Sequence, residues 1–188
     1  MRPADEFANI WVQLTGDRVT RELSERIYQL TKVVPGSSGP ERIRQAEPED
    51  YPWLFFWLVD FTIEVMGEVS NPWEFAHLTV TARLASERRT AGFMVLEKSG
   101  NRCCIVGYSG PTPHGIRIAP VYTPPSYRGR GYAFDLVRRV LQQLLDWGYH
   151  QVFLFTDLAN PISNHIYQQV GYRSVSNVDQ CHFQWRLA

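Results

Sequence analysis

The alternation of apolar and polar residues divides the chain into strand-like and helix-like segments. Period-two alternation predicts strands over residues 42–46, 91–97, 102–108 and 116–122. Apolar residues at helical spacing predict a helix over residues 132–147, and a strongly aromatic helix capped by Asp50 is predicted over 51–66. Asn71 as N-cap before Pro72 predicts another helix, over residues 72–87. The pattern ends with a nearly unbroken apolar strand, a short helix and an alternating last strand, over residues 151–156, 161–167 and 181–187. This order predicts a mixed α+β fold built on a central sheet.

The pattern indicates that the first 40 residues form a separate segment. The apolar residues of 10–14 predict a short strand, and residues 21–33, with Thr20 as the cap, predict a helix. The run Pro35-Gly-Ser-Ser-Gly-Pro40 is the clearest linker in the chain. We therefore expect an N-terminal extension over residues 1–40 and one domain over 41–188. The extension would serve packing or dimerisation, or be the remnant of a second domain.

Composition narrows the classes of partner. The 188 residues contain 19 basic and 19 acidic side chains, so the formal net charge is zero and nucleic acid is not an expected partner. The N-terminus lacks the apolar run of a signal peptide, and the most apolar stretch, residues 53–59, is too short to span a membrane. The 3 cysteines and 5 histidines show no metal-ligand spacing. We expect reduced thiols, no metal, no membrane partner and a cytoplasmic protein. Adjacent Cys103 and Cys104 would point to opposite faces of a strand.

A glycine-rich turn joins the strand over 116–122 to the helix over 132–147. Pro124 and Pro125 end the strand because proline cannot donate to a ladder. Gly129 and Gly131 allow backbone to approach a ligand closely, and the N–H groups of a helix start attract anions. Arg128 and Arg130 add positive charge, which suits a pyrophosphate. From the glycines alone, an ordinary strand–helix loop remains the alternative.

The turn, Arg128-Gly-Arg-Gly131-Tyr-Ala133, resembles the Q/R-x-x-G-x-G/A phosphate loop of the GNAT superfamily of acetyl-CoA-dependent N-acetyltransferases. A second match lies downstream in Asn160, Tyr167 and Gly171-Tyr172. The resemblance covers about residues 40–188 and is strongest over 116–173. It implies a mostly antiparallel central sheet with one splayed parallel strand pair and helices on both faces.

The resemblance also implies roles for individual residues, with acetyl-CoA as the acyl donor. The pantetheine arm would pair with the backbone of Val121, Tyr122 and Thr123, where one N–H would polarise the thioester carbonyl, and would bond Asn160. The pyrophosphate would lie on Arg128 and Arg130 and on the N–H groups of Gly129, Arg130, Gly131, Tyr132, Ala133 and Phe134. Tyr167 would protonate the departing thiolate. A packed aromatic is the alternative for Tyr167, and Asn160 also fits a helix cap.

The acceptor and the general base are less defined. Some family members carry a carboxylate five residues before the asparagine, where this chain has Phe155; Asp157, His114 and Glu97 are weak substitutes. Glu64 and Glu68, on and just past the aromatic helix over 51–66, could attract a cationic amine, although solvated surface is the simpler interpretation. We expect direct attack by a small-molecule amine or peptide acceptor, since Cys103 and Cys104 lie in mid-strand. A non-catalytic acyl-CoA-binding or regulatory module is the alternative.

Overall fold

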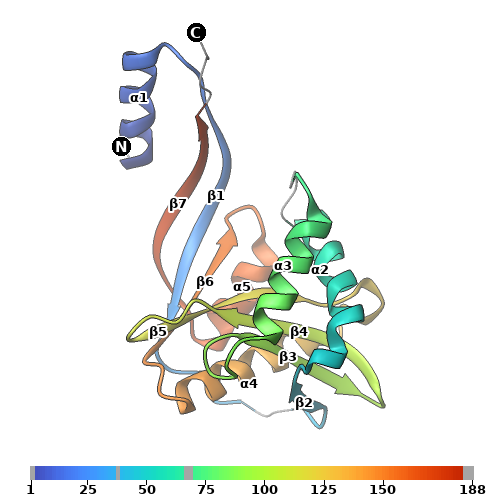
Figure 1. Ribbon diagram of the computed structural model, residues 1–188. Helices are drawn as coiled ribbons and strands as arrows, with labels where there is room; N and C mark the ends of the chain where they lie inside the picture. Colours follow the sequence, from blue (N-terminus) through green and yellow to red (C-terminus); the bar gives the residue numbers. More distant parts are fainter. Residues whose placement is uncertain (1–2, 37–38, 66–69, 184–188) are drawn as a thin grey trace.

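The computed structural model describes residues 3–36, 39–65 and 70–183, which form one sheet flanked by helices (Figure 1). The strands are β1 (Val19–Leu30), β2 (Arg42–Gln45), β3 (Gly92–Lys98), β4 (Asn101–Ser109), β5 (Gly115–Tyr122), β6 (Gln151–Asp157) and β7 (Arg173–Phe183). The helices are α1 (Pro3–Thr15), α2 (Tyr51–Val65), α3 (Pro72–Leu84), α4 (Tyr132–Asp146) and α5 (Pro161–Val170), with short 3₁₀ turns η1 (Pro48–Asp50) and η2 (Pro125–Tyr127). No helix in these described ranges is long and apolar enough to cross a bilayer.

The sheet confirms the expected fold class. Its described strands run in the order β2-β3-β4-β5-β6-β1-β7. Only β5 and β6 pair in parallel, and every other neighbouring pair is antiparallel. The crossover from β5 to β6 is α4, as a parallel pair requires.

Helices cover both faces of the sheet, as the resemblance implied. On one face, α4 buries Leu136, Val137, Val140 and Leu141 against the sheet, with Tyr172 in the same core. On the other face, α2 and α3 pack Leu54, Leu58 and Val80 onto Phe93 and Ile105. Helices α2 and α3 pack on strands of the β2–β5 half of the sheet.

The N-terminal segment corrects two sequence predictions. Residues 10–14 lie in α1 rather than in a strand, and most of residues 21–33 lie in β1 rather than in a helix. Strand β1 is inserted between β6 and β7, and the far ends of β1 and β7 extend with α1 beyond the rest of the sheet (Figure 1). The division of the chain near residue 40 stays a prediction. The last residue of the helix over 51–66, Glu68 and the end of the last strand, 184–187, lie outside the described residues.

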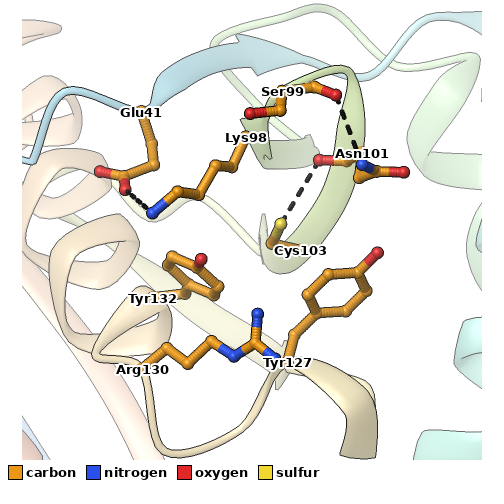
Figure 2. A pocket seen from close by; sticks show the side chains of 8 residues that line it. All are labelled: Glu41, Lys98, Ser99, Asn101, Cys103, Tyr127, Arg130 and Tyr132. Carbon is orange, nitrogen blue, oxygen red and sulfur yellow. Dashed lines mark hydrogen bonds and ion pairs between the residues drawn. The ribbon is translucent and has the colours of Figure 1, made fainter.

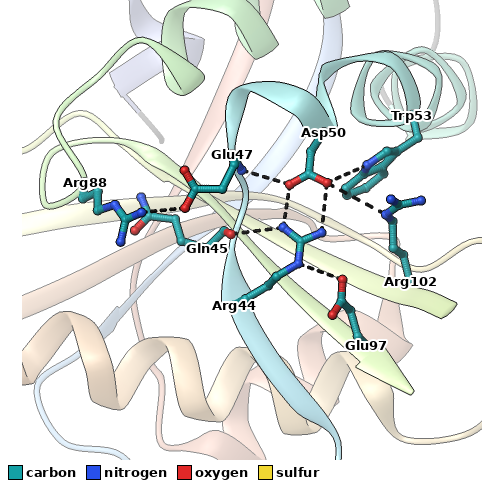
Figure 3. Close-up of polar contacts among 8 residues, drawn as sticks. All are labelled: Arg44, Gln45, Glu47, Asp50, Trp53, Arg88, Glu97 and Arg102. Carbon is teal, nitrogen blue, oxygen red and sulfur yellow. Dashed lines mark hydrogen bonds and ion pairs between the residues drawn. The ribbon is translucent and has the colours of Figure 1, made fainter. Parts of the chain in front are cut away.

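A polar network ties β2 and η1 to the neighbouring strand β3 (Figure 3). Asp50 was expected to cap α2, but it ends η1, and its carboxylate accepts from the Glu47 N–H, from Arg44 at 2.5 and 2.9 Å and from the Trp53 indole at 2.9 Å. Arg44 also donates to Glu97 at 2.7 Å. Burial alone raises the pKa of Asp50, but these donors outweigh it and lower the pKa to about 2.

This network predicts a pH-dependent stability. Because the pKa of Asp50 is depressed in the folded protein, its stabilisation is present above the ordinary pKa of about 3.9 and is lost as the pH falls toward 2. Asp50→Asn should lower the free energy of unfolding at neutral pH by about 2 kcal/mol. The difference from wild type should shrink between about pH 4 and pH 2. Urea unfolding across this range measures it, with the exposed neighbour Glu49→Gln as control; a difference independent of pH would contradict the assignment.

Candidate active site

Strands β5 and β6 form a fork in the middle of the sheet. They pair only over Gly115–Arg117 and Gln151–Phe153, at the start of each strand. Beyond these residues β5 stays with β4, where Tyr122 lies opposite Ile105, while β6 stays with β1. No described strand fills the gap between them. Their facing edges therefore offer backbone donors and acceptors to an extended, amide-containing ligand.

The loop after β5 is an anion cradle. Gly129 and Gly131 have φ of +72° and +78°, and α4 begins directly after Gly131 without a side-chain cap. The N–H groups of residues 129–134 make no hydrogen bond to any described residue; Asp135 is the first to bond, to the Gly131 carbonyl at 3.0 Å. Six consecutive free donors at a helix N-terminus suit a diphosphate. The structure thus assembles the predicted loop, while its binding role stays a prediction.

Arg128, the first residue of the loop motif, makes contacts within the protein, and its predicted role in binding the pyrophosphate stays a prediction. Its Nε donates to the Thr123 carbonyl at 2.9 Å, and its guanidinium forms an ion pair with Glu64 of α2 at 2.6 Å. The guanidinium also lies 6.0 Å from the centre of the Tyr122 ring. Its side chain therefore ties the loop to α2, a contact that the sequence did not reveal.

A cavity of about 480 Å³ borders the cradle on the side of the β3–β4 turn (Figure 2). It is lined by Glu41, Lys98, Ser99, Asn101, Cys103, Tyr127, Arg130 and Tyr132. Lys98 is paired with Glu41 at 3.2 Å, whereas Arg130 has no ion-pair partner among the described residues and lies 5.9 Å from the Tyr127 ring centre. The backbone N–H groups of Arg130 and Tyr132 thus belong to the cradle, while their side chains line the cavity.

The two adjacent cysteines correct a further expectation. Cys103 and Cys104 lie in the same buried core cluster rather than on opposite faces. A register shift of β4 against β3, between Leu96 and Glu97, leaves Cys103 as an extra residue and resets the alternation. All three cysteines of the chain are free thiols. Burial raises the pKa of Cys104 to about 12 and also raises that of Cys103, so neither is a ready nucleophile.

Tyr167 lies on α5, where it is half-buried. Its ring centre is 6.5 Å from that of Tyr28 and 5.8 Å from that of Tyr172. Burial, and to a smaller extent the nearby Cys104, raise the pKa of Tyr167 to about 12. The Cys104 thiol also accepts from the Thr123 hydroxyl at 3.2 Å, so the residue after β5 and Tyr167 both lie near Cys104. Tyr167 is therefore a packed aromatic whose hydroxyl stays protonated at neutral pH, and its role as proton donor stays a prediction.

Asn160 lies just before α5, beyond the end of β6. Its backbone N–H donates to the Asp157 carbonyl at 3.1 Å, and its carbonyl accepts from the Asn164 N–H at 3.2 Å. This is the expected N-cap position. Because β5 and β6 run in parallel, Asn160 follows β6 at the same end of the fork as Val121–Thr123. Its contact with pantetheine stays a prediction.

The candidate bases named from the sequence are not brought together. Glu97 is paired with Arg44, and His114 precedes β5 at the closed end of the fork, stacked on His150 at 5.7 Å. Asp157 accepts from the Ala159 N–H at 2.8 Å within a turn. The sequence interpretation missed Glu25, which lies opposite Asp157 on β1. The sequence pattern predicted a helix over residues 21–33, and this prediction hid the pairing of β1 with β6. No group of His, Cys, Asp and Glu that could hold a metal is found in the described part of the chain.

Solved structures share this fold at low identity. A GCN5-related N-acetyltransferase from Kribbella flavida is 16% identical with a TM-score of 0.65, over 92% of this chain and 61% of its own. An assigned GNAT-family acetyltransferase of Novosphingobium aromaticivorans is 21% identical with a TM-score of 0.64, over 90% of this chain and 69% of its own. A predicted acetyltransferase of Clostridium acetobutylicum, solved with acetyl-CoA, is 17% identical with a TM-score of 0.58, over 72% and 91%.

Sequence comparison supplies the family. A search of curated proteins finds no match. The family model described as Acetyltransferase (GNAT) family matches residues 40–172, which include the fork, the cradle and Tyr167. Because that match spans more than half of the chain, the protein belongs to the GNAT family of acetyltransferases.

Proposed function

We propose that this protein transfers an acetyl group from acetyl-CoA to a primary amine. One observation carries the proposal: the fork between β5 and β6 leads directly into six free N–H groups at the start of α4. Pantetheine has amides that match unpaired strand edges, and its diphosphate matches the cradle. Family membership supports the same donor.

The residues present fit each part of the donor. The edge of Val121–Thr123 would bond the pantetheine arm, as the resemblance implied, with Asn160 near the opposite strand. The N–H groups of Gly129–Phe134 would hold the diphosphate. The cavity beside the cradle, with its unpaired Arg130 and two tyrosine rings, would accept the nucleotide end.

The chemistry we propose is direct attack of the amine on the thioester within a ternary complex. The tetrahedral intermediate carries an oxyanion, which a fixed backbone N–H in the 121–123 stretch would stabilise. The leaving thiolate would take a proton from Tyr167, whose raised pKa keeps it protonated. A covalent acetyl-cysteine is disfavoured because burial raises the pKa values of Cys103 and Cys104.

Isothermal titration with acetyl-CoA tests donor binding. We expect saturable binding in the micromolar range, and absence of binding at millimolar acetyl-CoA would remove the proposal. Thiol release from acetyl-CoA with a panel of primary amines tests catalysis. Binding without amine-dependent thiol release would favour the alternative, a non-catalytic acyl-CoA-binding module.

A further inference from the structure

The insertion of β1 into the sheet places one carboxylate beside the fork. In the antiparallel ladder between β1 and β6, Glu25 lies opposite Asp157 and Ile27 lies opposite Phe155. Residues opposite one another in such a ladder point to the same face. Val152, Leu154 and Thr156 are buried, the first two in the core under α4, so Phe155, Asp157 and Glu25 face the other side of the sheet.

Arg117 of β5 and Phe155 of β6 contact each other on the face of the sheet that also carries Glu25. Arg117 belongs to the last residue pair that joins β5 to β6, at the point where the fork opens. Its guanidinium lies 5.0 Å from the centre of the exposed Phe155 ring. Glu25 is the diagonal neighbour of Phe155 in the ladder, at a spacing that a long side chain can reach. The carboxylate is thus next to the exposed Phe155 ring that Arg117 of β5 contacts.

The two faces of the fork offer complementary groups. Tyr167 and the Thr123–Cys104 contact lie with the core under α4 and α5. Glu25 lies on the opposite face, where β1 and β6 have at most sparse contacts with α2 and α3 in the described residues. A thioester held in the fork would therefore have a proton donor on one side and a proton acceptor on the other.

The charges around Glu25 suit a proton acceptor. Burial raises the pKa of Glu25; the Arg117 charge on β5 lowers it, and the Asp157 charge on β6 raises it again. On β7 the residue opposite is the uncharged Val178. On α3, Arg83 donates to the Ala119 carbonyl and interacts with Arg117. A carboxylate with a raised pKa binds a proton more readily than an ordinary one.

We infer that Glu25 is the general base for the acceptor amine; this inference rests on the proposed function. Glu25 takes one proton from the bound ammonium, and the freed nitrogen lone pair forms the C–N bond with the thioester carbonyl carbon. When the tetrahedral intermediate collapses, the C–S bond breaks with its electron pair on sulfur, and Tyr167 gives its proton to the thiolate. The second nitrogen proton returns to the Tyr167 oxygen through solvent, and Glu25 releases its proton to water.

Asp157 has a different part in this arrangement. Its carboxylate already accepts the Ala159 N–H at 2.8 Å, which fixes the turn after β6. Its charge raises the pKa of Glu25. Asp157→Asn is therefore the comparison variant, since it removes the carboxylate opposite Glu25 in the ladder without removing the base.

The experiment compares two amines of similar shape with saturating acetyl-CoA. Ethylamine is an ammonium ion at neutral pH and must lose a proton, whereas 2,2,2-trifluoroethylamine is already largely neutral. Glu25→Gln should lower ethylamine-dependent thiol release about 100-fold and trifluoroethylamine-dependent release less than about 10-fold. Asp157→Asn should change the ratio of the two rates far less than Glu25→Gln does, and Glu25→Asp should restore part of the ethylamine rate.

Each other outcome overturns the assignment. Equal losses for both amines in Glu25→Gln would indicate a structural role, and a larger selective loss of the ethylamine rate in Asp157→Asn than in Glu25→Gln would make Asp157 the base. Absence of amine-dependent release from wild type would also overturn the role of Glu25. Titration of the same preparations with acetyl-CoA separates the two failures: retained binding leaves the donor site intact, while lost binding in wild type removes the proposed function itself.

Discussion

Gly131→Val should weaken acetyl-CoA binding about 100-fold. Gly131 has φ of +78° and precedes the first residue of α4, and its own N–H belongs to the free row. A β-branched residue does not adopt this conformation readily, so the loop must rotate and the N–H groups that converge on the diphosphate must diverge. Isothermal titration with acetyl-CoA measures the loss.

Gly148→Val provides the control at the other end of the same helix. Gly148 has φ of +101° and, like Gly131, has open space where a Cβ would stand. Both variants should lose roughly 2 kcal/mol of the free energy of unfolding. Only Gly131→Val should lose acetyl-CoA affinity. Equal affinities in the two variants would show that the cradle does not hold the donor.

Tyr167→Phe should lower kcat about 10- to 100-fold and leave acetyl-CoA affinity nearly unchanged. The lost group is a hydroxyl that would bond a developing thiolate, a stronger interaction than a bond between neutral groups. Burial raises the pKa of Tyr167 to about 12, so its ionisation should not limit the wild-type rate below about pH 10. Steady-state thiol release across this pH range provides the measurement.

Tyr172→Phe is the matched control for Tyr167→Phe. The Tyr172 hydroxyl is buried and has no hydrogen-bond partner among the described residues, and its ring contacts Tyr167. Its removal should leave kcat unchanged and leave the free energy of unfolding equal or higher by about 1 kcal/mol. A similar loss of kcat in both variants would indicate that packing, and not proton donation, explains the effect at position 167.

The predicted elements from β2 to α5 are correct where each segment buries a single face. In α4, Leu136, Val140 and Leu144 recur at helical spacing, and all three are buried. The cradle was equally accessible to sequence reasoning because it is local. A strand end, two glycines and a helix start follow one another along the chain, so no distant contact is needed to form the row of N–H groups.

The predictions for the N-terminal segment are wrong because the spacing of its apolar residues does not match which of them are buried. Ile10, Val12 and Leu14 alternate as in a strand, yet they are 46%, 44% and 80% exposed on α1. In β1, Leu23, Ile27 and Leu30 are spaced as in a helix. The register of β1 against β7 shifts between Arg21 and Leu23 and between Ile27 and Tyr28, and such bulges disturb the period of two.

Other contacts near the site depend on the position of β1 in the sheet and on residues far apart in the sequence. Glu25 lies opposite Asp157 only because β1 is inserted beside β6. The ion pair between Arg128 and Glu64 joins residues that are 64 positions apart. Neither arrangement leaves a local signal, since both follow from which segments become neighbours in the sheet and across its face.

The backbone cradle is the claim on which donor binding depends, and ¹⁵N-glycine labelling tests it directly. The protein contains 13 glycines, of which Gly129 and Gly131 lie in the cradle and Gly148 lies beyond the far end of α4. Titration with CoA should move the amide signals of Gly129 and Gly131 strongly downfield, as expected for new charge-assisted hydrogen bonds, and leave Gly148 in place. Saturable CoA binding with the Gly129 and Gly131 signals unmoved would contradict the account.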